Sequence, residues 1–245
     1  MNHNSKNMGT LYSRSIGVLF AKGEYILTLD NDDMFFDEDV FNFIHNIGKE
    51  SNYDIIGFKS ILMKNYSDNI NKMKDNPFSS HANNLILYQP DLGRHPFLQN
   101  GSYNDINIWG KYIKTKIYKK SINILGKKRI SNFICWAEDT IIVFIIFNIA
   151  KSYKFVEKYG VVHLCSKSTA SNTQPKNNII FAEIFFLDIF LEFSKDDNYK
   201  NFAAFYALKI YKKYHINNFG DSKLLLYFKS IIKKIMKNQY ISKVN

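Results

Sequence analysis

The feature of this sequence with the clearest chemical meaning is a group of carboxylates behind a short apolar run. Residues 23–29 read GEYILTL, and Asp30, Asp32 and Asp33 follow at once. Carboxylates this close repel one another unless a hard cation or solvent takes up the charge, and no basic residue follows for several positions. The pattern indicates a divalent metal site that holds a phosphate-bearing substrate. A solvated acidic turn is the alternative.

The elements around these acids predict an α/β domain. Residues 24–29 have the composition of a buried strand, and residues 9–21 look helical, with Gly23 as a stop signal. In open parallel sheets, ligands bind beyond the carboxyl ends of the strands. We therefore expect Asp30 and Asp32 to lie at such an end.

The sequence on both sides of the acids resembles the family-2 glycosyltransferases, which are inverting sugar transferases of the type A fold. The family pattern reads N-x-G, then R-N-x-G, then A-x-G-E-Y-I, then L-D-x-D-D. The corresponding segments here are residues 7–9, 14–17, 21–26 and 29–33, in the same order. Ser15 stands where the family usually has Asn, and the rest of the pattern fits.

Later patches extend the resemblance. Residues 108–116 are similar to the W-x-K segment of the family, and residues 137–140 contain its E-D motif. Residues 159–163 and 167–171 are similar to its closing strand and its basic-Ser loop. Three ordered patches are more specific than any one of them alone.

The resemblance implies a set of donor-binding residues. Asp32 is the implied direct ligand of Mn²⁺ or Mg²⁺, and Asp30 is expected to support the ribose, the metal or both. His163 adds a metal or diphosphate contact, with a structural histidine as the alternative. We expect Asp33 to face solvent or to hold the loop.

The resemblance also implies an acceptor site. Asp139 is the implied general base, and Glu138 is expected to orient the acceptor or a neighbouring loop. Both residues could instead only stabilise a helix N-terminus through the macrodipole. Trp109 is predicted to stack on an acceptor sugar, and a place in the core is its alternative.

Basic residues supply the remaining candidates. Lys111, Arg14 and Lys167 are candidate phosphate contacts, with ordinary surface cations as the alternative. The formal net charge of +11 suits a nucleoside diphosphate or an anionic membrane surface. We see no nucleic-acid-binding signature, no secretory signal and no apolar run long enough to span a bilayer. Two cysteines do not form a disulfide framework, so we expect a cytoplasmic protein.

The sequence predicts two parts, a type A glycosyltransferase domain over residues 1–171 and a helical extension over residues 172–245. Family members usually carry a βαβ unit ahead of the N-x-G segment. Asn7 lies close to Met1, so the resemblance implies an α/β domain that lacks its first βαβ unit, and a partner that supplies this unit is one interpretation.

The expected function is metal-dependent transfer of a sugar from a nucleotide-sugar donor to a glycan, protein or lipid-linked acceptor hydroxyl. An inactive remnant, or a partner subunit of a split enzyme, is the alternative. A haloacid-dehalogenase-like phosphatase comes third, because Met34 stands where that class has Thr or Val.

The periodicity predicts the remaining elements. We expect helices over residues 37–50 and 140–151, a short basic helix after Trp109, strands over 53–63 and 153–164, and irregular structure over 85–101. Beyond residue 178 it predicts amphipathic helices over 179–193, 199–214 and 222–237. The last one places Leu225, Phe228, Ile232 and Ile235 on one face beside a basic flank, which suits either packing on the domain or an anionic membrane surface.

Overall fold

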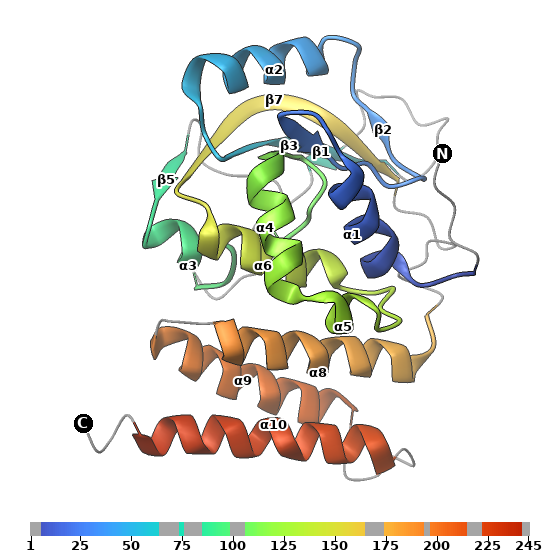
Figure 1. The fold of residues 1–245 in the computed structure, drawn as a ribbon, viewed down its shortest axis with the longest axis vertical. Helices are drawn as coiled ribbons and strands as arrows, with labels where there is room; N and C mark the ends of the chain where they lie inside the picture. Colours follow the sequence, from blue (N-terminus) through green and yellow to red (C-terminus); the bar gives the residue numbers. More distant parts are fainter. Residues whose placement is uncertain are drawn as a thin grey trace.

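The fold is taken from a computed structural model. It describes residues 6–63, 74–75, 85–98, 106–164, 174–193, 197–214 and 222–241. Figure 1 shows a twisted sheet with helices on both faces and a stack of three long helices at one end.

A mixed sheet forms the centre of the fold. Its strands are β1 (Tyr25–Leu27), β2 (Met34–Phe35), β3 (Ile55–Met63), β4 (Lys74–Asp75), β5 (Ile86–Tyr88), β6 (Lys111–Lys114) and β7 (Ser152–Leu164). The order is β1-β6-β3-β7-β2, with β4 on β3 and β5 on β7. β3 and β7 are parallel, and β6 is antiparallel to both β1 and β3. The carboxyl ends of β1, β3 and β7 therefore share one direction.

The long β3–β7 ladder is buried on both faces, which explains its nearly continuous apolar sequence. The two strands approach closely because glycines face large rings across the pair. A Cβ at Gly57 would overlap the Tyr153 ring, and a Cβ at Gly160 would overlap the Phe58 ring. The register shifts near Phe58, where the strands curl.

Helices cover both faces of the sheet, and three more form a bundle beyond it. The helices are α1 (Thr10–Phe20), α2 (Val40–Ser51), α3 (Asp91–Leu98), α4 (Thr115–Leu125), α5 (Lys127–Ile130), α6 (Glu138–Ile149), α8 (Lys176–Phe193), α9 (Asp197–Tyr214) and α10 (Ser222–Ile241). α2 packs on one face through Val40 and Ile44. α1, α4 and α6 contribute to the core on the other face.

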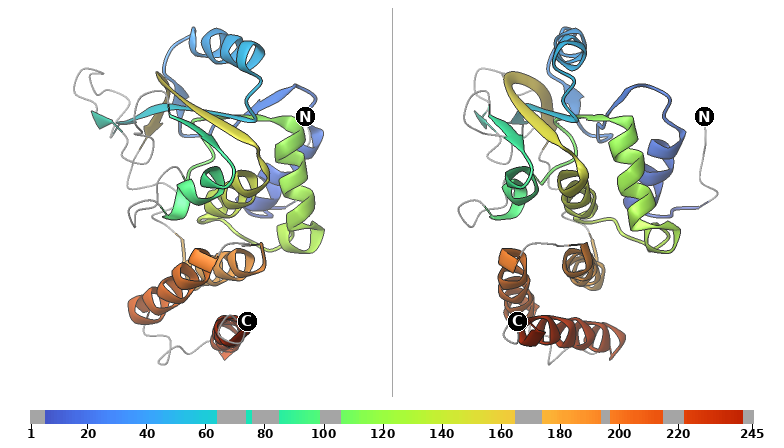
Figure 2. Two further views of the ribbon diagram at one scale, coloured as in Figure 1. Left: turned by 90° about the vertical axis from the view of Figure 1, so that its left-hand side faces the viewer. Right: turned by 60° about the vertical axis from the view of Figure 1, so that its left-hand side comes forward.

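α6 lies in the middle of the molecule. Its residues from Thr140 to Phe147 are buried all round, because α4 packs on one side of the helix and α8 on the other. A helix that is apolar on every side is expected in such a place. α8, α9 and α10 stack beyond it, as both views of Figure 2 show. One hydrophobic core runs from α1 to α10, so the helical extension packs directly on the α/β layers.

Most predicted elements are present with boundaries shifted by a few residues. One prediction is wrong, and strand β6 was not predicted. The region 85–101, expected to be irregular, contains β5 and α3. The segment after Trp109 begins with strand β6, and the expected basic helix follows as α4. β6 has only four residues, two of them lysines, so its sequence carries no strand periodicity.

The apolar stripe of the last helix faces the bundle. Leu224, Phe228, Ile231 and Ile235 are buried, whereas Leu225 and Ile232 lie at the edge of the stripe. Among the described helices, none is both long and apolar enough to cross a bilayer.

Candidate active site

The acidic turn lies where the sequence predicted, directly after β1. The backbone N–H of Asp33 donates to the carbonyl of Asp30 at 3.1 Å and closes the turn. Asp30 keeps about a third of its side chain exposed, at 32%, whereas the side chain of Asp33 is fully buried. The first and last acids of the turn therefore point into different surroundings.

Arg14 connects the acidic turn to the E-D motif. It projects from α1, and its guanidinium donates to Asp30 at 2.6 Å and to Glu138 at 2.8 Å. It also forms an ion pair with Asp139. The sequence predicted a phosphate contact or a surface cation at this position, but the Arg14 side chain is only 12% exposed and is surrounded by carboxylates.

The E-D motif opens α6. Ala137 precedes the helix with a φ of 56°, a left-handed conformation that turns the chain sharply into the first helical residue. Asp139 Oδ2 accepts the backbone N–H of Ile108 at 3.2 Å. The two acids thus lie at a helix N-terminus, where the macrodipole favours negative charge, and also face Arg14. The expected helix-stabilising role and the expected place in the site coexist.

The site carries more negative than positive charge. Burial, and next the charge of Asp139, raises the pKa of Glu138 to about 7 against the opposing effect of Arg14. Burial and Asp139 likewise raise the pKa of Asp30 to about 6. Burial disfavours the charged form of Arg14, but the three carboxylates outweigh it, so the pKa of Arg14 is raised. One guanidinium does not neutralise three acids, and the site is suited to a further cation.

Asp33 is a residue whose role the sequence left open. Its Oδ1 contacts His163 Nδ1 at 2.8 Å and accepts the backbone N–H of Leu164 at 3.1 Å. It therefore holds the loop and does not face solvent. The strand register gives the signal that sequence alone lacked, because Met34 pairs antiparallel with Val162, and extending this register by one residue brings Asp33 opposite His163.

His163 joins the acidic turn through this contact. Burial lowers the pKa of His163, but the hydrogen bond and charge of Asp33, followed by the charges of Asp30 and Asp32, raise it overall. Because Nδ1 faces Asp33, Nε2 is the nitrogen left to meet a ligand. Both expected roles, structural and ligand-binding, fit this position.

Trp109 lies in the core, which was one of its two predicted places, whereas Lys111 is buried and fits neither of its two expected roles. Trp109 is 6% exposed and its ring stacks on His163, with centroids 4.9 Å apart. It belongs to the core under α2 and offers no free face to an acceptor sugar. Lys111 is 1% exposed, and its ammonium donates to the carbonyl of Asn107. It is buried and holds the backbone at Asn107, so it is not a surface cation that could meet a phosphate. Lys167 lies outside the described residues.

The donor set suits a hard cation with few protein ligands. Mg²⁺ and similar ions are usually bound by one or two carboxylates together with substrate phosphates. Asp30 and Asp32 carry oxygens of this kind, and a cation near Asp30 would offset the charges of the neighbouring acids that act on it. Within the described part of the chain, no three His, Cys, Asp or Glu side chains form a complete metal cage.

Comparisons with known proteins identify the family and the fold. The family model described as "Glycosyl transferase family 2" matches residues 2–125. The crystal structure of S. aureus TarS 1-349 is similar to this chain, with a TM-score of 0.56 and 12% identity, over 96% of this chain and 62% of that one. A search of the curated proteins gave no match.

The same TarS segment in complex with UDP-GlcNAc is similar with a TM-score of 0.56 and 12% identity, over 97% of this chain and 64% of that one. This chain thus spans less than two thirds of the length of those structures. At this identity the likeness concerns the fold, and it includes both the curled sheet and the C-terminal helices.

Proposed function

The chain belongs to glycosyl transferase family 2, and we propose that it transfers a sugar from a nucleoside-diphosphate donor to an acceptor hydroxyl. Its mixed α/β architecture has the type A glycosyltransferase fold with added C-terminal helices, as the sequence predicted. The family assignment also removes the phosphatase hypothesis.

The observation that carries the proposal is the convergence at Arg14. Three segments far apart in the sequence meet here, because Arg14 lies within hydrogen-bond distance of Asp30 and of both members of the Glu138–Asp139 pair. The family resemblance implied a donor role for Asp30 and an acceptor role for the Glu138–Asp139 pair. Their shared contact with Arg14 supports the proposal that donor and acceptor are bound next to each other, which the sequence alone does not ensure.

We propose that Asp30 and Asp32 hold the donor diphosphate through Mn²⁺ or Mg²⁺. The bound cation supplies positive charge to the leaving nucleoside diphosphate. Arg14 adds a fixed positive charge next to Asp30, and His163, held by Asp33 through Nδ1, keeps Nε2 for a contact with the donor. Asp33 keeps this turn in register with β7, so its contribution is to position the donor-binding residues.

For the acceptor side we propose Asp139 as the general base, with Glu138 orienting the acceptor. The Ile108 N–H and the Arg14 guanidinium hold both oxygens of Asp139 in a fixed direction. Glu138 is the second candidate, because a carboxylate with a pKa of about 7 is well matched to proton transfer at neutral pH. The acceptor is a hydroxyl of a glycan, a protein or a lipid-linked glycan.

Calorimetry of the full chain with UDP and GDP, with and without Mn²⁺, tests the donor assignment. UDP-GlcNAc is the first nucleotide sugar to try, because a TarS structure contains it. We expect Mn²⁺-dependent binding that Asp32→Ala abolishes. Glu38→Ala is the matched control, since it removes an exposed carboxylate from the nearby segment between β2 and α2. Equal binding by all three proteins would remove the metal assignment, and no binding would support the non-catalytic alternative.

The base assignment needs a turnover assay against a panel of acceptors. A base acts in the transition state, so Asp139→Asn should lower turnover by roughly 10²–10⁴-fold with donor binding nearly intact. Glu138→Gln should lower it less. The reverse order would exchange the two roles, and retention of activity by both variants would contradict the proposed site.

A further inference from the structure

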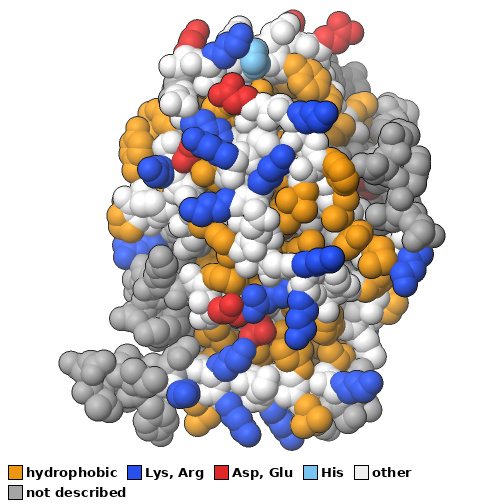
Figure 3. All heavy atoms as spheres, in the orientation of Figure 1, with side chains coloured by type: hydrophobic (Ala, Val, Ile, Leu, Met, Phe, Trp, Pro, Cys, Tyr) orange, Lys and Arg blue, Asp and Glu red, His pale blue; other side chains and the backbone are white. Residues whose placement is uncertain are grey.

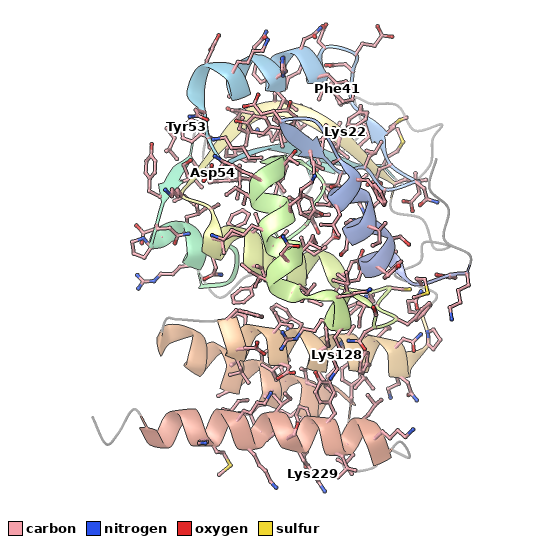
Figure 4. All side chains as sticks on the ribbon, in the orientation of Figure 1. Lys22, Phe41, Tyr53, Asp54, Lys128 and Lys229 are labelled. Carbon is pink, nitrogen blue, oxygen red and sulfur yellow. The ribbon has the colours of Figure 1, made fainter. Side chains whose placement is uncertain are left out.

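The outward face of α10 is a row of lysines on the side of the helix that no other described element covers. The buried stripe of α10 contains Phe228 and Ile231, which face α8 and α9. At 100° per residue, the opposite side carries Lys229, Lys233 and Lys237. Figure 4 shows Lys229 projecting away from the other two helices of the bundle.

This face has no acidic residue. The sequence of α10 is SKLLLYFKSIIKKIMKNQYI, and no described carboxylate forms an ion pair with Lys229, Lys233 or Lys237. Lys234, which lies beside them, pairs instead with Asp188 on α8. Lysines four residues apart on a helix repel one another, so an external anion would relieve strain that the protein itself leaves in place.

Two apolar side chains are exposed among the lysines. Leu226 is 65% exposed and Met236 is 51% exposed, although α10 has a separate buried stripe for packing. Lys233 and Lys237 follow Leu226 by 7 and 11 residues, so all three lie along one line of the helix. Figure 3 shows Lys and Arg side chains along the lower end of the visible face, where α10 lies.

We propose that this face of α10 binds the surface of an anionic lipid bilayer. Lysines spread along a straight helix fit a plane of negative charge, and exposed Leu and Met side chains add contact with the interfacial region. Nucleic-acid binding fits less well, because α10 has no arginine to form bidentate phosphate contacts.

The mode of contact differs from the one that the sequence suggested. The apolar stripe with Phe228 and Ile235 packs inside the protein, so it does not enter the membrane. The bilayer instead meets the polar side of α10. Adsorption is therefore mainly electrostatic and reversible, with strong dependence on ionic strength.

Vesicle co-sedimentation of the full chain tests this contact. Vesicles of phosphatidylcholine alone are compared with vesicles that contain phosphatidylglycerol, at about 50 mM and about 0.5 M NaCl. We expect binding only to the anionic vesicles at low salt. The triple variant Lys229→Gln, Lys233→Gln, Lys237→Gln should lower the partition coefficient by about tenfold or more, because each basic residue contributes separately.

The matched control removes the same charge elsewhere. Lys22, Lys49 and Lys151 are exposed and lie outside the C-terminal helices, and their change to Gln should leave binding within about twofold of wild type. Equal losses in both triple variants would overturn the proposal, since net charge alone would then explain binding. So would an absence of binding to anionic vesicles, or tighter binding to single-stranded RNA that only the α10 variant loses.

Discussion

Two buried clusters of charged residues in this molecule differ in how the charge of their acids is balanced. In the bundle, Glu183 of α8 receives Lys213 Nζ and the hydroxyl of Tyr214, each at 3.0 Å. One acid meets one cation, and Lys213 keeps half of its side chain in solvent. In the candidate active site, one Arg14 serves three carboxylates and is itself buried.

The difference separates a structural ion pair from a binding site. A balanced cluster gains nothing further from a ligand, whereas a cluster with excess negative charge is completed by a cation. Both clusters link elements distant in the sequence, so long-range contact alone does not distinguish them. The ratio of cations to carboxylates in each cluster distinguishes them, and this ratio can be altered by mutation.

The largest effect is expected for Arg14→Met. Removing the guanidinium leaves three carboxylates facing one another, and breaking a buried ion pair by deleting one partner costs about 3–5 kcal/mol. Urea unfolding measures the loss. Arg129→Met is the control, because the Arg129–Glu192 pair is more exposed and should cost about 1 kcal/mol or less. Equal losses would contradict the view that Arg14 is the central cation of the site.

A smaller loss is expected for Glu183→Gln. The amide still accepts a hydrogen bond from Tyr214, and Lys213 can turn to water, so we expect a cost of about 1–2 kcal/mol. Nucleotide binding should not change. A loss as large as that of Arg14→Met, or weakened donor binding, would show that the bundle cluster is not simply a structural pair.

Glu138→Gln should reveal the excess negative charge of the site in the pH dependence of protein stability. The pKa of Glu138 is about 7 in the folded protein, above its ordinary value of 4.5. The folded state thus binds the proton more tightly, so the stability of wild type relative to the variant is fully present below pH 4.5 and is lost as pH rises through 7.

Thermal unfolding at acidic and at alkaline pH checks this. The variant should gain about 3 °C over wild type at alkaline pH and little at acidic pH. Glu183→Gln, measured in the same way, should show no such gain. A gain independent of pH would mean that Glu138 does not titrate in this range.

The smallest effect is expected for Ser15→Ala. Ser15 replaces the usual Asn of the family, and its buried hydroxyl has no hydrogen-bond partner among the described atoms. Its loss should change the free energy of unfolding by less than about 0.5 kcal/mol. The buried hydroxyl of Ser121 donates to the carbonyl of Tyr118 at 2.7 Å, so Ser121→Ala should cost about 1 kcal/mol. A larger cost for Ser15→Ala would reveal a partner that this structure does not contain.

The sequence predicted the positions of some site residues and not of others. Asp30 and the Glu138–Asp139 pair lie together as expected, because they belong to local patterns with a fixed place in the fold. The burial of Lys111 was not predicted, and for Trp109 the sequence left the core and the acceptor site as alternatives, since their burial depends on which face of β6 and of the adjoining chain packs under α2 or near α6. A four-residue strand has no periodicity from which this could be predicted.

The sequence by itself determined most of the local elements, the family and the acids at the end of β1, since each of these follows from residues near one another in the chain. Tertiary structure decided the partners. It turned Arg14 into the shared counter-ion of three acids and placed Asp33 against His163 through the β2–β7 register. It also directed the apolar side of α10 inward and its lysines outward. Such choices depend on contacts between distant segments, where burial sets the cost of every unpaired charge.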